Sequence, residues 1–371
     1  MAKKVRVLIV DDSALVRDIL AQGLAADPNI EVVGTAPDPF VARDKIVELR
    51  PDVLTLDVEM PRMDGVEFLR RLMPQYPIPV VMVSSLTQRG KEITMQALEA
   101  GAVDFVAKPT SNVAQGLQSM MFELRTKVKI ASTANVAHWK NKREELFTTM
   151  RGAATPNAGT SSSGAAPASP FASKSRALSE STDKVIAIGA STGGTEALRK
   201  VLRHLPATMP GIVITQHMPA GFTKTFADRL NEECEMHVKE AQNGDRVMNG
   251  KVLVAPGDMH MKIIRSGGRY EITLSQEDKV NGHRPSVDVM MKSVAENVGA
   301  NAVGVILTGM GNDGAAGLKA MRDAGAETFA QDEATSVVYG MPKVAFEVGA
   351  VKAVLPLNSM AEALVNVLGV K

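Results

Sequence analysis

The sequence predicts an α/β protein with two consecutive domains, each built on a mostly parallel sheet. Short runs of β-branched residues alternate with longer helical patterns in both halves of the chain, as in strands joined by crossover helices. Between the halves, residues 151–170 are Ala, Gly, Ser, Thr or Pro except at Arg151 and Asn157. The length of 371 residues also exceeds what one ordinary core supports, so we expect two domains.

The first half contains five strand and helix patterns in strict alternation. Strands are predicted at 5–10, 31–36, 53–57, 80–85 and 104–108, and helices at 13–24, 40–49, 66–73, 91–101 and 117–128. Five such units in a row predict a doubly wound (βα)5 sheet with helices on both faces. We place this N-terminal domain at residues 1–131.

A flexible linker is expected at residues 132–182. Its Ala, Gly, Ser, Thr and Pro composition offers too little apolar surface to offset the entropy that ordering would cost. The segment 137–150, at its start, could instead extend the last helix or pack on either domain.

Alternation resumes in the second domain, placed at residues 183–371. Strands are predicted at 184–190, 211–217, 302–311 and 350–357, and helices at 195–205, 222–233, 315–325 and 360–368. One segment differs, because residues 251–276 show strand alternation with Gly-rich turns. A β-hairpin or small antiparallel patch is therefore expected within an otherwise parallel α/β domain.

Composition excludes several classes of protein. Forty-two basic and forty-one acidic side chains give a net charge of +1, which provides no electrostatic footprint for nucleic acid or for an anionic membrane. Cys234 is the single cysteine, so neither an intrachain disulfide nor a cysteine zinc site can form. No apolar run approaches the roughly 20 residues that span a bilayer, and no signal-peptide pattern is present. We expect a soluble cytoplasmic protein without membrane insertion.

Polar residues stand at the carboxyl ends of four of the five N-terminal strands. These residues are Asp11 and Asp12 after the first strand, Asp57 after the third, Ser84 after the fourth and Lys108 after the fifth. One Asp in such a place often only caps the next helix, but five polar residues on one rim favour a shared site. Three carboxylates that meet there would repel one another unless a cation such as Mg²⁺ joined them.

This set has the chemistry of a phosphorylation switch. Asp57 can attack a phosphoryl donor, Lys108 can neutralise the transferred group, and Ser84 can hydrogen-bond its oxygens. The motifs LIVDDS, LDVEMPRMDG, VVMVSS and DFVAKP resemble the receiver domain of two-component response regulators over residues 5 to about 125. The resemblance implies Mg²⁺-dependent phosphorylation of Asp57.

The stretch GASTG, residues 189–193, fits the nucleophile elbow pattern G-x-S-x-G. A predicted strand precedes it and a predicted helix follows it, so the hydroxyl of Ser191 would be exposed on a sharp turn. The same small residues would also suit a phosphate-binding loop or close packing alone, which leaves both readings open at this point.

A nucleophilic serine needs a base, and the base needs a group that orients it. Of the six histidines, three fall near the linker or in ordinary helical and strand patterns: His138, His204 and His237. The remaining candidates are His217, His260 and His283, of which only His217 closes a strand parallel to that of Ser191. For the orienting carboxylate, Asp313 in a Gly-rich turn after a strand competes with Asp258 and Asp288. Position favours Ser191, His217 and Asp313, and on this interpretation His283 is not essential.

The motifs IGASTGG, QHMP, VLVAPGDMHM, NGHRPSVD and ILTGMGNDGA resemble the catalytic domain of the chemotaxis protein-glutamate methylesterases, the CheB family, from residue 184 to about 368. The resemblance implies that Ser191, His217 and Asp313 are the catalytic triad and that Thr192 and Met310 are candidates for the oxyanion hole. Arg284 could contact the substrate or make a structural ion pair.

The resemblance also implies an activity and partners. The protein would be a phosphorylation-regulated hydrolase that releases methanol from glutamate methyl esters on chemoreceptors, and it could also deamidate receptor glutamines. Methyl-accepting chemoreceptors would be the substrate and a chemotaxis histidine kinase the phosphodonor, and the esterase reaction would need no cofactor. The alternative is a response regulator whose second domain binds a nucleotide or partner without catalysis. A G-x-x-x-x-G-K-[ST] loop would have supported that alternative, and none is present.

Overall fold

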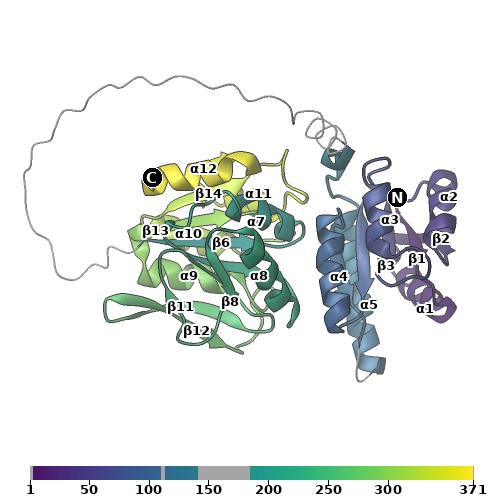
Figure 1. Ribbon diagram of the computed structural model, residues 1–371, viewed down its shortest axis with the longest axis horizontal. Helices are drawn as coiled ribbons and strands as arrows, with labels where there is room; N and C mark the ends of the chain where they lie inside the picture. Colours follow the sequence, from purple (N-terminus) through teal and green to yellow (C-terminus); the bar gives the residue numbers. More distant parts are fainter. Residues whose placement is uncertain (1–2, 110–112, 141–183, 371) are drawn as a thin grey trace, which may run out of the picture.

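The structure is a computed structural model that describes residues 3–109, 113–140 and 184–370. Two α/β domains stand side by side, and helices α4 and α5 of the N-terminal domain face the C-terminal domain (Figure 1). No helix in the described part of the chain is long and apolar enough to cross a membrane.

The N-terminal domain contains the five predicted strands in one parallel sheet, in the order β2-β1-β3-β4-β5. The strands are β1 (Val5–Val10), β2 (Ile30–Ala36), β3 (Val53–Asp57), β4 (Val80–Ser84) and β5 (Asp104–Ala107). The helices are α1 (Ala14–Ala25), α2 (Pro39–Leu49), α3 (Gly65–Leu72), α4 (Gln88–Glu99) and α5 (Val113–Ala131). Each residue of β3 and β4 is buried because helices cover both faces of the sheet. The strand order reverses between β1 and β3, where ligands bind in such folds.

The C-terminal domain is built on a seven-stranded sheet, and all of its strand pairs are parallel. The sheet order is β15 (Ala353–Leu355), β14 (Glu327–Gln331), β13 (Ala302–Ile306), β6 (Val185–Ala190), β7 (Gly211–Gln216), β10 (Lys251–Val254) and β8 (His237–Glu240). Its helices are α7 (Gly194–Leu202), α8 (Phe222–Glu233), α9 (Val287–Asn297), α10 (Ala315–Asp323), α11 (Met341–Glu347) and α12 (Leu357–Leu368), with the 3-10 turn η2 (Gly299–Asn301). The chain leaves β6 in one direction and later returns to its other side, so the strand order reverses beside β6.

The expected antiparallel hairpin is present, but it is shorter than the pattern suggested. β11 (His260–Ser266) and β12 (Arg269–Ser275) pair through a Gly-Gly turn, and β9 (Arg246–Val247) adds a third strand. The first part of the segment, Lys251–Val254, belongs to the main parallel sheet instead. Full burial of its last three residues explains the difference, because a central strand reads as a continuous apolar run.

The segment that follows α5 packs against both domains. After a short turn the chain forms the 3-10 helix η1 (Ala137–Lys140), and Trp139 is buried. Asn135 reaches the C-terminal domain, where its backbone N–H donates to the carbonyl oxygen of Val337 over 2.8 Å. Most of the predicted linker, residues 141–182, lies outside the described residues, so the domain boundaries stay a prediction.

Candidate active site

Ser191 lies directly after β6, at the rim where the strand order of the C-terminal sheet reverses. Its backbone N–H donates to the carbonyl oxygen of Thr308 over 3.0 Å, and Gly193 follows with a φ of 77° at the start of α7. A side chain at Gly193 would be strained in this conformation and would also collide with Val337. The glycine therefore permits the sharp turn that leaves Ser191 partly exposed.

His217 directly follows the neighbouring strand β7. Its backbone hydrogen-bonds the last residue of β6, the strand that precedes Ser191. Its N–H donates to the carbonyl oxygen of Ala190 over 3.1 Å. The ring Nε2 hydrogen-bonds Oδ2 of Asp313 over 2.7 Å. The other ring nitrogen, Nδ1, is buried and has no hydrogen-bond partner among the described residues. One nitrogen is thus fixed by a carboxylate, and the other is open to accept a proton.

Asp313 completes the group from the turn after β13, on the other side of β6. Its carboxylate is almost fully buried and accepts five hydrogen bonds. The donors are His217 Nε2 (2.7 Å), Asn281 Nδ2 (2.8 Å), Ser286 Oγ (2.7 Å), Val287 N (2.7 Å) and Asp288 N (3.2 Å). Burial alone would raise the pKa of Asp313, but the bonds from His217, Asn281 and Ser286 outweigh it and hold the pKa well below its usual range.

The loop before α9 contributes three residues that sequence reasoning did not assign to the site. Asn281 and Ser286 bind Asp313, and the ring of His283 stacks on the ring of His217 with centroids 3.7 Å apart and an interplanar angle of 8°. The Asn-Gly pair at 281–282 is a turn signal that could have placed His283 beside a strand end. Nothing in the sequence indicates that this turn faces β7.

The competing candidates have structural partners. Both ring nitrogens of the buried His260 are engaged, by the carbonyl oxygen of Asp278 and the backbone N–H of Ser286. Asp288 accepts from the backbone N–H groups of Gly314 and Gly317. The contacts of Asp288 hold α9 against the turn after β13.

Arg284 forms the structural ion pair that was one of its two expected roles. Its guanidinium binds Oδ1 of Asp258 over 2.7 Å and donates to the carbonyl oxygens of Gln276 and Glu277. The same residue still lines the cleft at Ser191. Its guanidinium therefore fixes the loop that carries His283, and a contact with substrate stays a prediction.

The candidate oxyanion residues lie in different environments. Thr192 is buried, and its hydroxyl donates to Oδ2 of Asp104 in the N-terminal domain over 2.7 Å. Met310 is 46% exposed at the edge of the same cleft. The cleft has a volume of about 960 Å³, and Ser191 and His217 line it together with residues of helix α5. The site is therefore covered in part by the N-terminal domain.

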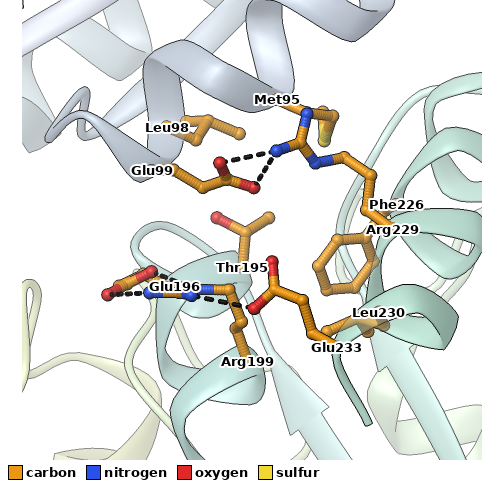
Figure 2. A pocket seen from close by; sticks show the side chains of 10 residues that line it. All are labelled: Met95, Leu98, Glu99, Thr195, Glu196, Arg199, Phe226, Arg229, Leu230 and Glu233. Atoms are coloured by element: carbon orange, nitrogen blue, oxygen red, sulfur yellow. Dashed lines mark hydrogen bonds and ion pairs between the residues drawn. The ribbon is translucent and has the colours of Figure 1, made fainter. Parts of the chain in front are cut away.

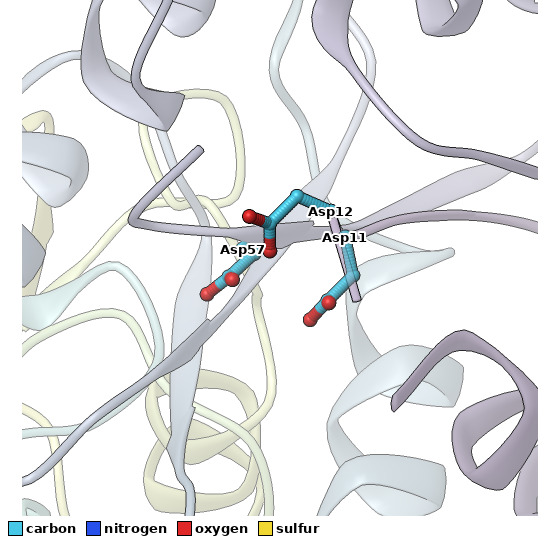
Figure 3. Close-up of side chains that lie close together, drawn as sticks. All are labelled: Asp11, Asp12 and Asp57. Carbon is cyan, nitrogen blue, oxygen red and sulfur yellow. The ribbon is translucent and has the colours of Figure 1, made fainter. Parts of the chain in front are cut away.

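A second polar site lies at the carboxyl ends of the N-terminal strands. Oxygen atoms of Asp11, Asp12 and Asp57 lie within 4.8 Å of one another (Figure 3). Lys108 Nζ is 3.1 Å from Asp11 Oδ2 and 3.0 Å from Asp57 Oδ1. The hydroxyl of Ser84 points elsewhere, toward Thr94 Oγ1 and the carbonyl oxygen of Gly90 in helix α4.

Burial dominates the electrostatics of this pocket. It raises the pKa of Asp57 to about 6, with Asp11 adding to the rise and Lys108 opposing it. The three converging carboxylates, of which Asp11 and Asp57 are buried, form an all-oxygen donor set of the kind that Mg²⁺ prefers. The residues present therefore fit a bound Mg²⁺ ion.

Comparison with known proteins finds a matching family for each of the two domains. Residues 186–364 match the family model "CheB methylesterase" and residues 7–118 match "Response regulator receiver domain". A protein-glutamate methylesterase/protein-glutamine glutaminase of Syntrophotalea carbinolica is 63% identical over 99% of both chains. A protein with the same description from Sulfurimonas denitrificans is 51% identical over 96% of both chains.

The receiver match contains the acidic pocket, and the methylesterase match contains Ser191, His217 and Asp313. With identity of this level over nearly its whole length, the chain belongs to the CheB family of methylesterases that carry an N-terminal response regulator receiver domain.

Proposed function

We propose that the chain hydrolyses γ-methyl esters of glutamate on methyl-accepting chemoreceptors, with Ser191, His217 and Asp313 as its triad. The observation that carries this proposal is the arrangement at three adjacent strand ends. There a partly exposed serine shares a cleft with a histidine whose Nε2 is bound to a buried carboxylate. Its Nδ1 has no hydrogen-bond partner within residues 3–109, 113–140 and 184–370. The relatives' descriptions support the substrate.

In the proposed reaction, Nδ1 of His217 takes the proton of Ser191 as its Oγ attacks the ester carbonyl carbon. The tetrahedral intermediate collapses when the C–O bond to the methoxy group breaks, and the imidazolium gives its proton to the leaving group, which departs as methanol. Water activated by the same nitrogen then cleaves the acyl-enzyme and leaves a glutamate carboxylate. Asp313 remains ionised throughout and stabilises the imidazolium through Nε2.

The oxyanion would be held by the backbone N–H groups of Thr192 and Met310. Both residues line the cleft of Ser191, and the resemblance to the family makes them the candidates for these donors. Glutamine deamidation would follow the same acyl-enzyme route with ammonia as the leaving group, and the descriptions of both relatives include it.

The receiver domain would control this reaction through phosphorylation of Asp57 by a chemotaxis histidine kinase. Asp11, Asp12 and Asp57 would hold Mg²⁺, which when bound neutralises charge on the phosphoryl group. A carboxylate oxygen of Asp57 would attack the phosphorus atom as the bond from phosphorus to the donor atom of the kinase breaks and the kinase side chain leaves. Lys108 and Ser84 would bind the oxygens of the transferred group. We propose 1–131 as the receiver, 132–182 as the linker and 183–371 as the esterase, in a cytoplasmic protein.

The decisive experiment replaces the nucleophile. Ser191→Ala in the phosphorylated full chain is expected to lower methanol release from a methylated chemoreceptor by about three orders of magnitude or more, because the triad acts as a unit. Mass spectrometry should also find a serine-directed phosphonate on Ser191 of the unmodified chain.

The control in this experiment is the receiver, which should accept phosphate normally in the Ser191→Ala variant. More than about a tenth of the activity in that variant would contradict the assignment. Absence of phosphonate from Ser191 would favour a second domain that binds without catalysis.

A further inference from the structure

The ring of His283 covers one face of the His217 ring. The two centroids are 3.7 Å apart and the planes differ by 8°, so the rings lie almost parallel in van der Waals contact. This contact lies on a flat face of His217 and leaves both ring nitrogens, which lie at the ring edge, available. The stack therefore adds to the hydrogen bond with Asp313 without competing with it.

A histidine base needs more than one restraint if its free nitrogen is to point at a serine. The hydrogen bond from Nε2 to Asp313 fixes one atom of the ring. It does not fix the ring plane, which could still turn about the line between Nε2 and the carboxylate oxygen. Because Nδ1 has no hydrogen-bond partner in the described part of the chain, no second bond supplies the missing restraint.

His283 can supply it because its own backbone is held firmly. Val280 and His283 exchange two backbone hydrogen bonds, N to O over 3.1 Å and 2.9 Å, around Asn281 and Gly282. The φ angles of 53° and 81° at these two residues are those of a type I′ turn, which favours Asn-Gly. The side chain of Asn281 binds Asp313 from the same turn. A single turn thus fixes the carboxylate and the stacking ring together.

The chain is also anchored immediately after the stacked ring. Arg284 binds Asp258 and two backbone carbonyl groups, and the backbone N–H of Asp258 donates to the carbonyl oxygen of Arg284 over 3.1 Å. Ser286 then caps α9 and binds Asp313. His283 therefore sits between two anchored segments, which makes its ring a rigid surface.

We infer that His283 is a positioning residue, whose ring holds the plane of the His217 imidazole so that Nδ1 faces Ser191. The inference rests on the proposed role of His217 as the base. It assigns His283 no proton transfer, because the ring presents its face to His217 and not a nitrogen. It departs from the expectation that His283 is not essential.

The protonation behaviour of His283 agrees with this role. Burial, followed by the proximity of His217, lowers the pKa of His283 to about 4, although Asp313 opposes the shift. His283 is consequently neutral near pH 7, and a neutral aromatic face can accept the positive charge that His217 gains during the reaction. Two charged imidazoles in contact would instead repel each other.

The test compares three replacements of His283 in the phosphorylated full chain, with methanol release from a methylated chemoreceptor as the readout. His283→Ala removes the ring, His283→Gln keeps a side chain of similar length without an aromatic face, and His283→Phe keeps a flat ring that cannot titrate. We expect kcat to fall about 10- to 100-fold in the Ala and Gln variants, the cost of a poorly aimed catalytic group. KM should change less than about twofold, because His283 acts on the base and not on substrate binding.

The kcat of His283→Phe distinguishes a stacking role of His283 from a role in proton transfer. His283→Phe should retain kcat within about threefold of the unmodified chain, since stacking and not proton transfer is required. His204→Ala serves as the matched control, because His204 is exposed and its ring bonds the carbonyl oxygen of Lys200 within the same helical region. Thermal unfolding of each variant separates loss of fold from loss of alignment. If His283→Ala does not fold, the comparison of Phe with Gln decides.

Two outcomes would overturn the inference. Full kcat in His283→Ala would show that no stacking partner is needed, and equally low kcat in the Phe and Gln variants would show that the imidazole chemistry of His283 itself is required. A failure of the proposed triad would look different, because Ser191→Ala or His217→Ala would then keep activity. The three His283 variants therefore test the inference when Ser191→Ala and His217→Ala are both inactive.

Discussion

At the scale of single residues, the burial of charge determines how each site works. Asp313 is a buried carboxylate with five donors, so it remains an anion and does not compete with His217 for the proton. Asp57 is also buried, but Lys108 is the one cation within ion-pairing distance among the described residues, and Asp11 lies beside it. The Asp313 carboxylate is already stabilised as an anion by its five donors. The Asp57 carboxylate would gain stability as an anion from additional positive charge.

This difference predicts that Asp57 needs a metal ion to react. With Mg²⁺ and a small radioactive phosphodonor, label should appear on Asp57, because the cation relieves the repulsion among Asp11, Asp12 and Asp57. Chelation of the metal should reduce labelling by at least about tenfold, which corresponds to about 1.4 kcal/mol. The measurement is radioactive label on the intact chain that alkali removes.

Asp57→Asn is the matched variant, since it keeps the shape of the side chain and removes the nucleophilic carboxylate. It should carry no label while its esterase activity without phosphodonor is unchanged. Labelling that persists after chelation would contradict the metal argument, and labelling that persists in Asp57→Asn would move the acceptor elsewhere.

At the scale of elements, helix α4 connects the phosphorylation pocket to the esterase. In the middle of the helix, the hydroxyl of Thr94 hydrogen-bonds Ser84 Oγ over 2.5 Å. At its last residue, Glu99 forms a 2.6 Å ion pair with Arg229 of α8 (Figure 2). Ser84 must give up its bonds to α4 before its hydroxyl can bind a phosphoryl group. A change in the hydrogen bonds of Ser84 therefore also changes the contacts of α4, the helix that contacts the C-terminal domain.

Removal of the Thr94 hydroxyl should therefore sensitise the protein to phosphorylation. Thr94→Val keeps the shape of the side chain and frees Ser84 from one hydrogen bond of about 1 kcal/mol, equivalent to roughly a fivefold shift in equilibrium. The titration of esterase activity against phosphodonor should move to about fivefold lower concentration. Thr133→Val is the control, because the exposed hydroxyl of Thr133 donates to the carbonyl oxygen of Ile130 within its own turn. An unmoved titration curve would mean that Ser84 is not held back by α4.

Sequence reasoning found the elements whose signals are local. Alternating strands and helices predicted the receiver sheet, and strand ends predicted which residues meet, because parallel strands present their carboxyl ends on one rim. It misplaced Lys251–Val254, where a buried parallel strand and an antiparallel one look alike in a short window. The His283 stack and the Asp104 contact were not predictable, since each joins segments whose approach depends on how loops or whole domains pack.

At the scale of the whole molecule, the receiver covers the esterase through three kinds of contact. The ring centroids of Phe105 and Phe222 lie 4.4 Å apart, and Glu99 forms an ion pair with Arg229. Asp104 accepts a hydrogen bond from the hydroxyl of Thr192, beside the proposed nucleophile. Asp104 is itself held by Lys127, 2.9 Å from its Oδ1. The receiver thus places a fixed carboxylate next to Ser191.

Docking of this kind predicts that the unphosphorylated chain is inhibited. Asp104→Ala should raise its activity toward methylated receptor up to about tenfold, because a hydrogen bond to a charged group contributes about 1.5 kcal/mol. Asp44→Ala is the control, since Asp44 is exposed and pairs with its neighbour Arg43. A fragment of residues 180–371 should also exceed the unphosphorylated full chain. Equal rates for the fragment and the full chain would instead favour recruitment as the role of the receiver.

The hydrogen bond between Asp104 and Thr192 also has a consequence in the opposite direction. If phosphorylation of Asp57 weakens docking and so increases the affinity for receptor, thermodynamic reciprocity requires that bound receptor favours phosphorylation of Asp57 by the same factor. Methylated receptor should therefore raise the fraction of chain phosphorylated at a fixed level of phosphodonor, and Asp104→Ala should diminish this effect. The protein would then be phosphorylated most readily where unprocessed substrate is abundant, so that substrate acts as a signal for its own removal.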